Sequence, residues 1–408
     1  MTRRVVVVGM ALTSALGTGV KNSFERLHTL ENCIQYDKEL ENYKGLHTRL
    51  SSKVKDFIIP EDFSRKTTRT MGNVALMSTA VSKQALSDAG LLNDPIITSG
   101  QTGVAYGSCS GSIDAISDFY SVCVNHEIKN LNSGSYIRMM SHTAAVNISL
   151  YFKTHGRLIP TSSACTSGSM AIGYAYEAIK SGLQTVMITG GAEEYSPANI
   201  GVFDTLFATS VKNSTPNLTP SPFDKERDGL VLGDGAGTLI LEEYEHAKSR
   251  GAKIYAEVAG FATNTDGTHI TNPNSEMMAS VMKQALENAN IDSKQIGYIS
   301  AHGTGTLNGD IAETKATHDV FGSNTPISSL KSYIGHTLGA CGAIEAITGI
   351  EMMNNNWFHP TLNLKNVDEN CADLDYIIKN PRNTDTQYIM SNNFAFGGIN
   401  TSLIFKRI

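Results

Sequence analysis

The sequence of 408 residues lacks the features that mark several large classes of protein. It has six cysteines, none in a Cys-x-x-Cys pair or in a ligand-spaced cluster with histidine, which excludes a disulfide scaffold and a structural zinc site. No apolar run reaches the length of about 18 residues that a membrane-spanning helix needs. We therefore expect a globular protein of the reducing cytoplasm, with no membrane association.

An excess of positive charge is also absent. The 33 Lys and Arg residues against 39 Asp and Glu give a net charge of −6, which excludes a protein that coats nucleic acid through its overall field. Any anionic partner must therefore bind a local basic patch. With 41% hydrophobic residues and only 11 prolines, the chain has the composition of an ordered protein with a large core.

The order of short apolar runs and amphipathic segments predicts an α/β protein with buried, mostly parallel sheets. Four successive valines, Val5–Val8, favour a buried strand over the apolar region of a secretion signal, and residues 9–19 then read as a loop. The predicted strands are Arg4–Val8, Thr102–Tyr106, Thr185–Thr189, Gly237–Leu241, Tyr255–Gly260, Tyr298–Ala301, Pro326–Ser329 and Tyr388–Ser391. The predicted helices include Gly72–Ala89, Ser169–Ser181, Ser275–Asn288 and Ala340–Asn354.

The two halves of the chain repeat each other. The tetrapeptide Lys-Gln-Ala-Leu occurs at residues 83–86 and again at 283–286, each time within a predicted helix. Two further matches follow in the same order, namely Pro160–Cys165 with Pro326–Lys331, each opening a helix, and Val186–Gly191 with Tyr388–Asn393. Three ordered matches indicate an internal duplication. We therefore expect an N-terminal half (residues 1–250) and a C-terminal half (residues 251–408) that share one packed core.

Cys165 is the first candidate for chemistry. It lies where the strand-like run Ile159–Ala164 meets a predicted helix, and such a corner exposes a side chain. The helix dipole and the free N–H groups of the first turn favour a thiolate there and can hold an oxyanion. Two alternatives stay open: a small buried cysteine without chemistry, and Cys109 as nucleophile, because Gly107–Gly111 has the Gly-x-nucleophile-x-Gly pattern of a hydrolase elbow.

Two histidines lie in glycine-rich turns of the second half. His302 stands in Ala301–Thr306 and His336 ends Lys331–His336, each after a predicted strand. Since α/β proteins place ligand-facing groups at such turns, we expect both histidines to meet Cys165 in one site, the alternative being structural or solvated histidines. The sequence has no His-Glu-x-x-His motif, dinucleotide fingerprint or Walker A loop, so no metal or nucleotide site is expected.

Several of these segments together resemble the β-ketoacyl-acyl carrier protein synthases, most closely the type II elongating condensing enzymes of bacteria. The matching segments span the chain and are Ser163–Gly168, Ser221–Gly229, Gly233–Gly237, Ala301–Thr306, Lys331–His336 and Asn393–Asn400. The resemblance implies a thiolase-like fold, in which two similar halves build a five-layer αβαβα sandwich. It also implies a dimer, formed with an identical chain or with a related ketosynthase-like subunit, and no cofactor beyond the phosphopantetheine of the acyl carrier protein.

The resemblance further implies a role for each matching residue. Cys165 would accept the acyl chain from the carrier protein thioester, and His302 and His336 would serve malonyl decarboxylation and condensation. Backbone N–H groups of Cys165 and Phe396 would form the oxyanion hole. The other implied residues set orientation and charge around His336 (Lys331, Glu345), gate or line the acyl pocket (Phe396, Phe394), or touch the pantetheine arm (Thr304, Thr306).

The last motif departs from the usual family pattern. Ala395 and Ile399 stand where the family commonly has Gly and Thr. The added methyl group between Phe394 and Phe396 restricts the backbone of the gate. Gate motion or substrate order is therefore expected to differ from the family pattern.

Two further predictions concern the substrate and its carrier. Ser110 lies near a position that is often small or apolar in the acyl tunnel, with Met139 and Met140 as neighbours across the dimer, so its hydroxyl favours a polar or conjugated acyl chain. Carrier proteins of this kind are typically acidic, and the cluster at residues 65–69 offers cations for docking; a solvated helix face is the alternative. The residues predicted to dock the carrier are Arg65, Lys66 and Arg69.

The leading functional prediction is a β-ketoacyl-acyl carrier protein synthase, an acyltransferase that elongates fatty acids by decarboxylative Claisen condensation with malonyl units. A dedicated ketosynthase of a polyene or polyketide pathway, alone or paired with a chain-length factor, is the main alternative. A degradative thiolase would use coenzyme A thioesters and a second cysteine near the C-terminus, which Phe394–Asn400 lacks. A non-catalytic partner subunit would lack the nucleophile, so the presence of Cys165 disfavours it.

Overall fold

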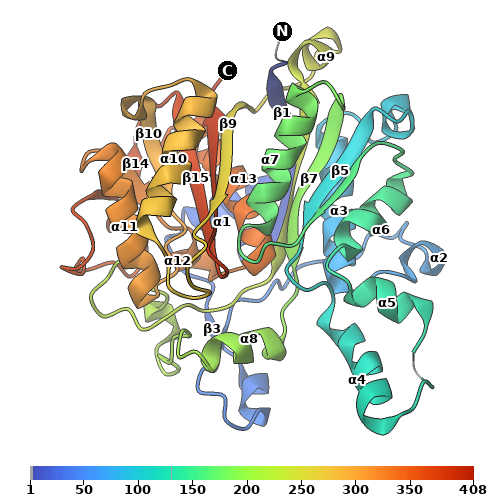
Figure 1. The fold of residues 1–408 in the computed structure, drawn as a ribbon, viewed down its shortest axis with the longest axis horizontal. Coiled ribbons are helices and arrows are strands. Elements are labelled where there is room, and N and C mark those ends of the chain that lie inside the picture. Colours follow the sequence, from blue (N-terminus) through green and yellow to red (C-terminus); the bar gives the residue numbers. More distant parts are fainter. Residues whose placement is uncertain (1–2, 130) are drawn as a thin grey trace.

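The computed structural model describes residues 3–129 and 131–408. Its two halves meet where β1 (Val5–Ser14) of the first half pairs with β9 (Ala256–Thr265) of the second. Figure 1 shows the strands of the first half on the right of the molecule and those of the second half on the left. The short β1–β9 pairing joins the two sheets edge to edge.

Five strands form the sheet of the first half, in the order β1–β8–β7–β5–β6. The central β7 pairs antiparallel with β8 and parallel with β5. The bounds of these strands are β5 (Thr102–Gly107), β6 (Leu158–Thr161), β7 (Val186–Glu193) and β8 (Gly235–Glu243).

The second half repeats this order as β9–β16–β15–β10–β11, with the short β13 added at its outer edge. The bounds are β10 (Ile296–Ser300), β11 (Pro326–Ser328), β13 (Asp375–Tyr376), β15 (Tyr388–Ala395) and β16 (Ile399–Lys406). Both sheets are mixed, and the prediction of mostly parallel sheets is wrong. Only three residues separate β15 from β16, and so tight a connection permits only antiparallel pairing.

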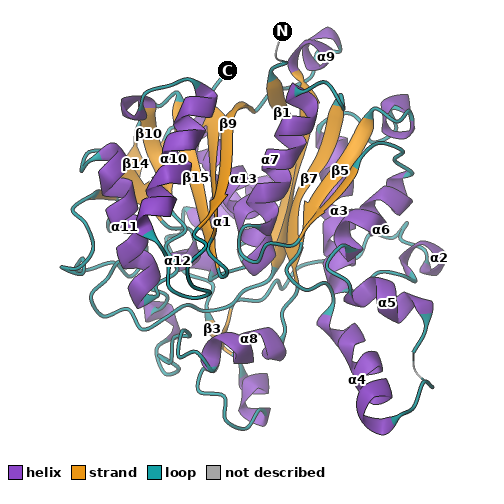
Figure 2. Ribbon diagram, in the orientation of Figure 1, coloured by secondary structure: helices purple, strands orange, loops and turns teal. Residues whose placement is uncertain are grey.

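Helices cover both faces of each sheet and produce five layers (Figures 1 and 2). Two helices pack against each other between the sheets, α7 (Ser167–Lys180) and α13 (Cys341–Asn355). The outer face of the first sheet carries α3 (Asn73–Asp88) and α6 (Thr143–Phe152), and that of the second carries α10 (Ser275–Ala289) and α11 (Leu307–Phe321). The prediction of a thiolase-like αβαβα sandwich is confirmed.

Shorter helices and strands lie around these five layers. The helices are α1 (Val20–Leu27), α2 (Arg65–Thr68), α4 (Ile116–Asn125), α5 (Ser133–Met139), α8 (Pro197–Asp204), α9 (Tyr244–Ser249) and α12 (Lys331–Ile334). The short strands are β2 (Gly17–Thr18), β3 (Gln35–Tyr36), β4 (Leu50–Ser51), β12 (Trp357–Phe358) and β14 (Arg382–Asn383).

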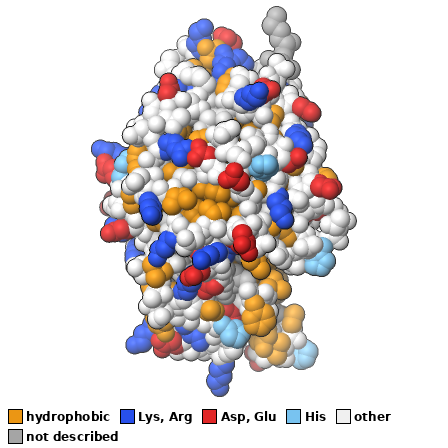
Figure 3. Space-filling view, turned by 90° about the vertical axis from the view of Figure 1, so that its left-hand side faces the viewer, with side chains coloured by type: hydrophobic (Ala, Val, Ile, Leu, Met, Phe, Trp, Pro, Cys, Tyr) orange, Lys and Arg blue, Asp and Glu red, His pale blue; other side chains and the backbone are white. Residues whose placement is uncertain are grey.

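Two properties of the whole molecule bear on its partners. Among the helices of the described residues, none is both long and apolar enough to cross a membrane. Figure 3 shows the side of the molecule that lies on the left in Figure 1, where Lys and Arg side chains alternate with Asp and Glu. This face has no extended patch of one sign, as a net charge of −6 spread over a mixed surface predicts.

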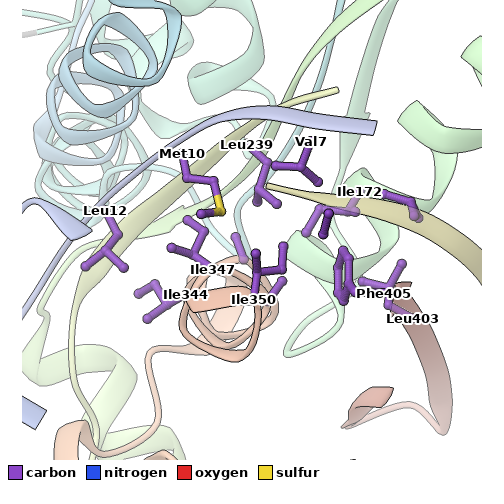
Figure 4. Packing of buried hydrophobic residues seen from close by; sticks show 14 of the residues in the cluster. Val7, Met10, Leu12, Ile172, Leu239, Ile344, Ile347, Ile350, Leu403 and Phe405 are labelled. Atoms are coloured by element: carbon purple, nitrogen blue, oxygen red, sulfur yellow. The ribbon is translucent and has the colours of Figure 1, made fainter. Parts of the chain in front are cut away.

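The central helix α13 is buried on all sides, because it lies between the two sheets. Figure 4 shows Ile344 of this helix directed at Leu12 of the first sheet, and Ile347 and Ile350 directed at Met10 and Leu239. Each fully buried aliphatic side chain contributes about 1.5–3 kcal/mol, and the packing holds the helix rigidly. The N-terminus of α13 is therefore a fixed reference point for the residues around it.

The repeated tetrapeptide marks one contact that the two halves share. Gly9 in β1 and Gly260 in β9 lie beside irregularities in strand register, and each packs against the helix that carries the repeat. A Cβ atom on Gly9 would lie 2.3 Å from the carbonyl oxygen of Ala85, and one on Gly260 would lie 2.6 Å from that of Ala285. Glycine is needed at both places because strand and helix approach too closely for any side chain.

Several sequence predictions fail in detail. Residues 9–14 continue β1 and do not form a loop, because they are buried and pair with β8. The strand β16 and the helix α11 were not predicted. The match of Pro326–Lys331 with Pro160–Cys165 holds for the strands, since β11 takes the place of β6, but the helix that follows is the short α12. The counterpart of α7 is α13, which begins ten residues after Lys331.

Candidate active site

Cys165 lies at the corner between β6 and α7, as the sequence predicted. The corner is tight: Ala164 has a φ of 51°, which is strained for a residue with a side chain, and the Ser167 hydroxyl accepts the backbone N–H of Ser163 at 2.9 Å. Only 4% of Cys165 is exposed. The corner places Cys165 just before the first turn of α7, where backbone N–H groups lack helical partners.

The thiol of Cys165 is protonated in the resting protein. Burial raises its pKa to about 11, although the ammonium group of Lys331 and the backbone N–H groups of Phe396 and Cys165 itself act in the opposite direction. These groups all favour negative charge on the sulfur. The site is therefore arranged to stabilise a thiolate that forms during a reaction, while the resting group remains a neutral thiol.

His336 contacts the sulfur directly, with Nε2 3.0 Å from Sγ of Cys165. Its other ring nitrogen, Nδ1, accepts the backbone N–H of Leu338 at 3.1 Å. Burial and the charge of Lys331 hold the pKa of His336 well below its ordinary value, so the ring is neutral at pH 7. A neutral ring that accepts at Nδ1 carries its proton on Nε2, and that proton points at Cys165.

His302 follows β10 and stands perpendicular to His336, with 5.1 Å between ring centroids. Nδ1 of His302 lies 3.1 Å from the ammonium group of Lys331, which donates to it. Burial, Lys331 and His336 together lower the pKa of His302 well below its ordinary value. His302 is therefore also neutral with its proton on Nε2, so both rings present N–H donors to one space.

Lys331 is charged although it is buried. Its Nζ lies 2.5 Å from Oε1 of Glu345, whose Oε2 accepts Nδ2 of Asn393 at 2.7 Å. Burial opposes the charge, but the ion pair with Glu345 outweighs it and raises the pKa of Lys331 above its ordinary value. The pair keeps a donor directed at His302. The sequence placed Lys331 and Glu345 around His336 instead, and Lys331 acts on that ring only through its charge.

The ligand atoms of Cys165, His302 and His336 lie within 4.8 Å of one another, close enough to hold a metal ion. The hydrogen bonds oppose that use. A metal needs an unprotonated nitrogen, and the proton displaced from Nε2 would have to sit on Nδ1, where Leu338 or Lys331 already donates. The cluster is better suited to donate two protons toward an oxygen atom than to bind a cation.

A pocket of about 320 Å³ opens onto this cluster. Thr304 and Thr306 line it, with their hydroxyl oxygens 2.8 Å apart, and so do Phe394 and Phe396. The phenyl ring of Phe396 lies 5.2 Å from that of Phe203, at the boundary between the pocket and an apolar cluster that includes Ile200. The structure thus brings the predicted nucleophile, histidines, threonines and phenylalanines into one cavity.

Two sets of predicted residues lie elsewhere. Ser110 is not among the pocket-lining residues; its hydroxyl faces Glu193, which also accepts the backbone N–H of Cys109. Glu193 therefore holds the segment around Cys109, the alternative nucleophile, in place. The predicted carrier-docking residues Arg65, Lys66 and Arg69 are exposed on and beside α2, outside the pocket.

The sequence did not identify Glu313 and Asn393. The carboxylate of Glu313 accepts the backbone N–H groups of His302 at 2.7 Å and Gly303 at 2.6 Å, and thereby holds the turn that carries the histidine. Asn393 links Glu345 to His302. The sequence holds no signal for Glu313, because the burial of Asp310 and Glu313 on one helix, which is unusual for acids, is known only from the structure.

Comparison with known proteins finds family models for both halves of the chain. Residues 2–247 match the family model described as the N-terminal domain of β-ketoacyl synthase, and residues 255–365 match the model of its C-terminal domain. The whole chain is 38% identical to 3-oxoacyl-[acyl-carrier-protein] synthase 2 of Vibrio harveyi, over 99% of that protein.

Two solved structures share the fold over 100% of both chains. One is a β-ketoacyl synthase from Burkholderia phymatum, with 53% identity and a TM-score of 0.98. The other is a ketosynthase solved in complex with its type II polyketide acyl carrier protein, with 29% identity and a TM-score of 0.89. Family models cover both halves and relatives match over the full length, so the chain belongs to the β-ketoacyl synthase family.

Proposed function

We propose that the protein is a 3-oxoacyl-acyl carrier protein synthase that extends an acyl chain by condensation with a malonyl unit. The observation that carries this proposal is the meeting of a thiol at a helix N-terminus with two neutral imidazoles whose Nε2–H groups face the same pocket. Relatives that match the full chain have the same activity in their names. The chemistry divides into two steps at these residues.

In the first step the sulfur of Cys165 attacks the carbonyl carbon of an acyl thioester. The tetrahedral oxyanion is held by the N–H groups of Cys165 and Phe396, both of which act on the sulfur in the resting state. The carbon–sulfur bond to the carrier then breaks, and the thiol proton passes to the departing pantetheine sulfur. The product is an acyl group on Cys165 and a free carrier thiol.

In the second step a malonyl thioester loses CO₂. The electron pair of the broken bond moves into an enolate, whose oxygen accepts the Nε2–H groups of His302 and His336. The enolate carbon attacks the acyl carbonyl on Cys165, the carbon–sulfur bond to Cys165 breaks, and the thiolate that leaves takes up a proton from water. Each imidazole stays neutral, so the pair acts as hydrogen-bond donors without prior protonation.

The reaction as proposed needs no metal or dissociable cofactor, because both substrates arrive on the phosphopantetheine of an acyl carrier protein and loss of CO₂ drives the condensation. Thr304 and Thr306 would contact that arm at the pocket wall. We expect a cytoplasmic dimer, formed with a second copy or with a related ketosynthase-like subunit. The exposed cations of α2 would attract the acidic carrier.

Mass spectrometry tests the nucleophile. Incubation with an acyl carrier protein thioester should add the mass of the acyl group to the wild-type chain and leave Cys165→Ala unmodified. Acyl transfer that persists in Cys165→Ala would refute the assignment. His302→Ala and His336→Ala should lose malonyl decarboxylation and keep much of the acyl transfer; full condensation by either variant would refute the histidine roles.

Carrier docking on α2 has its own test. Replacing Arg65 and Arg69 with Glu should weaken binding of the carrier and flatten the dependence of binding on salt concentration. An unchanged affinity would remove the docking role of α2.

A ketosynthase of a polyene or polyketide pathway is the second candidate. It is favoured by Ala395 and Ile399, which form the last residue pair of the β15–β16 hairpin beside Phe396. Products made from malonyl carrier protein and primers of different length and unsaturation distinguish the two. Saturated primers extended fastest support fatty acid elongation, and conjugated primers extended fastest support the second candidate.

A further inference from the structure

The mouth of the catalytic pocket is lined by exposed apolar side chains. Four residues stand at the outer edge of the pocket, where their side chains are largely exposed: Leu206 (48%), Phe207 (81%), Ile270 (68%) and Leu307 (60%). They come from three separate segments, the end of α8, the loop after β9 and the first residue of α11. Single exposed apolar residues are ordinary, but four around one opening indicate a contact surface. We call these four residues the apolar rim.

Phe207 occupies a backbone position that suits glycine. The N–H of Ala208 bonds to the carbonyl of Phe203 at 3.0 Å, and the N–H of Phe207 bonds to that of Asp204 at 3.0 Å, which is the Schellman pattern at the end of a helix. The residue at that position must be left-handed, and Phe207 has a φ of 53°. A large aromatic side chain there costs stability twice, through the left-handed backbone and through its exposure to water. A residue that is unfavourable in both ways indicates a role in binding.

Neighbouring groups hold Phe207 in place. The ring of His47 lies 5.7 Å from the phenyl ring, and Nδ1 of His47 is 2.9 Å from the buried carboxylate of Asp204. The same carboxylate accepts the backbone N–H groups of His47 and Thr48. The turn that carries Phe207 is therefore fixed by hydrogen bonds. The side chain loses little conformational entropy when a partner covers it.

The pocket mouth carries little charge to attract a partner. Among the described residues that line the pocket, none is Lys or Arg. The one carboxylate at the mouth, Asp266, already accepts Nδ2 of Asn400 at 2.7 Å and the backbone N–H of Asn274 at 3.1 Å. A partner at this opening is bound through apolar contact, in contrast to the charged α2.

We propose that the apolar rim binds an apolar patch on the carrier protein, with Phe207 as its anchor. The proposal rests on the function proposed above. Cys165 is 4% exposed behind the pocket, and a substrate tethered by a flexible arm reaches it only when the carrier sits over the opening. Side chains exposed around that opening then face the carrier. An aromatic anchor with surrounding aliphatic side chains has the composition of an interface hot spot.

Steady-state kinetics of Phe207→Gly test the proposal. Glycine suits the left-handed position, so this variant should fold and melt at or above the wild-type temperature. We expect KM for malonyl carrier protein to rise about tenfold, by the same factor at low and high ionic strength, with kcat unchanged. KM for malonyl-pantetheine, which lacks the carrier, should stay the same. Leu183→Ala is the matched control, since Leu183 is 47% exposed beyond the far end of α7.

Two results would overturn the proposal. An unchanged KM for the carrier substrate would show that the rim does not bind it. An equal rise for malonyl-pantetheine would show that Phe207 acts on the pantetheine arm and not on the carrier. Ile270→Ser provides an independent variant on a second segment of the rim and should behave like Phe207→Gly. Failure of the proposed function is separable, because then neither thioester would acylate Cys165 in the wild-type protein.

Discussion

Cys165 and Cys341 occupy comparable places in the two halves and have different surroundings. Cys165 lies just before α7, and Cys341 is the first residue of α13. Burial raises the pKa of both thiols. Only Cys165 lines the pocket and meets His336, whereas Sγ of Cys341 donates to the carbonyl oxygen of Cys165 at 3.2 Å. A duplicated fold supplies two helix N-termini, and access to the pocket decides which thiol reacts.

The scaffold of the two halves is alike, and the chemistry is divided between them. Both halves share one strand order and one glycine contact between strand and helix. The first half provides the cysteine, and the second half provides both histidines, Lys331 and Glu345. Matching substitutions in the two halves should therefore change stability by similar amounts and catalytic rate by different amounts.

The largest difference is expected between the two cysteines. Cys165→Ala should lower the rate of condensation by at least about a thousandfold, as loss of a nucleophile does, because no acyl-enzyme forms. Cys341→Ala should stay within about threefold of the wild-type rate, since it removes no group from the pocket. Product formation from acyl and malonyl carrier proteins measures both. Comparable losses in the two variants would mean that Cys341 takes part in the chemistry.

The second-largest effect is a loss of stability, equal in the two halves, at the equivalent glycines of β1 and β9. Gly9→Ala and Gly260→Ala should each lower the free energy of unfolding by about 1–3 kcal/mol, because the new Cβ overlaps a helix carbonyl in both halves. Urea denaturation measures the change. Gly201→Ala is the control, since a Cβ there meets no atom within 4 Å. A large loss at one glycine only would show that the halves are packed differently.

The histidines of the second half should make stability depend on pH. Burial lowers the pKa of His302 and His336 well below 6.5, so the unfolded chain binds protons that the folded chain does not as the pH falls below about 6.5. Each group should then reduce the free energy of unfolding by up to about 1.4 kcal/mol per pH unit. Urea denaturation at neutral and acidic pH should show a smaller acid loss in His302→Gln than in the wild-type chain. His155→Gln, an exposed site in the first half, should match the wild type; an unaltered slope in His302→Gln would contradict the neutral buried state.

The smallest effect is expected at the gate. Ala395→Gly removes the methyl group from the last residue pair of the β15–β16 hairpin and should cost about 0.5–1 kcal/mol of stability. The looser hairpin should let Phe396 move more readily and speed acylation of Cys165 a few-fold with long acyl chains, which rapid-quench measurements detect. Ala395→Ser serves as the control that keeps a Cβ atom. Acylation at the wild-type rate in Ala395→Gly would show that this methyl group does not restrict the gate.

Much of the fold was predictable because hydrophobic periodicity and repetition are local. The run Val5–Val8 predicted the first strand, and the Lys-Gln-Ala-Leu repeat predicted that α3 and α10 are equivalent helices. The predictions failed where local preference was weak. Residues 9–14 lack a run of β-branched residues and become strand only because β8 pairs with them. α11 begins within a glycine-rich segment, so its start was hidden.

The site was predictable to a similar degree and for a similar reason. Cys165 and His302 each follow a strand in a turn, which is a pattern visible in the sequence. His336 was expected to do the same but follows the short helix α12. Glu313 escaped notice because its partners are backbone N–H groups of His302 and Gly303, and a backbone contact leaves no motif. For Arg65 the sequence shows only that the residue is positively charged. It does not show how far α2 lies from the pocket.

By itself the sequence determined the duplication, the strand-to-helix corner at Cys165 and the two histidine-bearing turns as candidates, because each is visible as a short local motif. Tertiary structure alone decided which nitrogen of each histidine carries the proton, since Leu338 and Lys331 supply the donors. It also decided that Cys165 faces the pocket and Cys341 does not, and that Phe207 stands at the pocket mouth. Direction and access depend on contacts between distant segments, and those contacts exist only after the two halves have packed together.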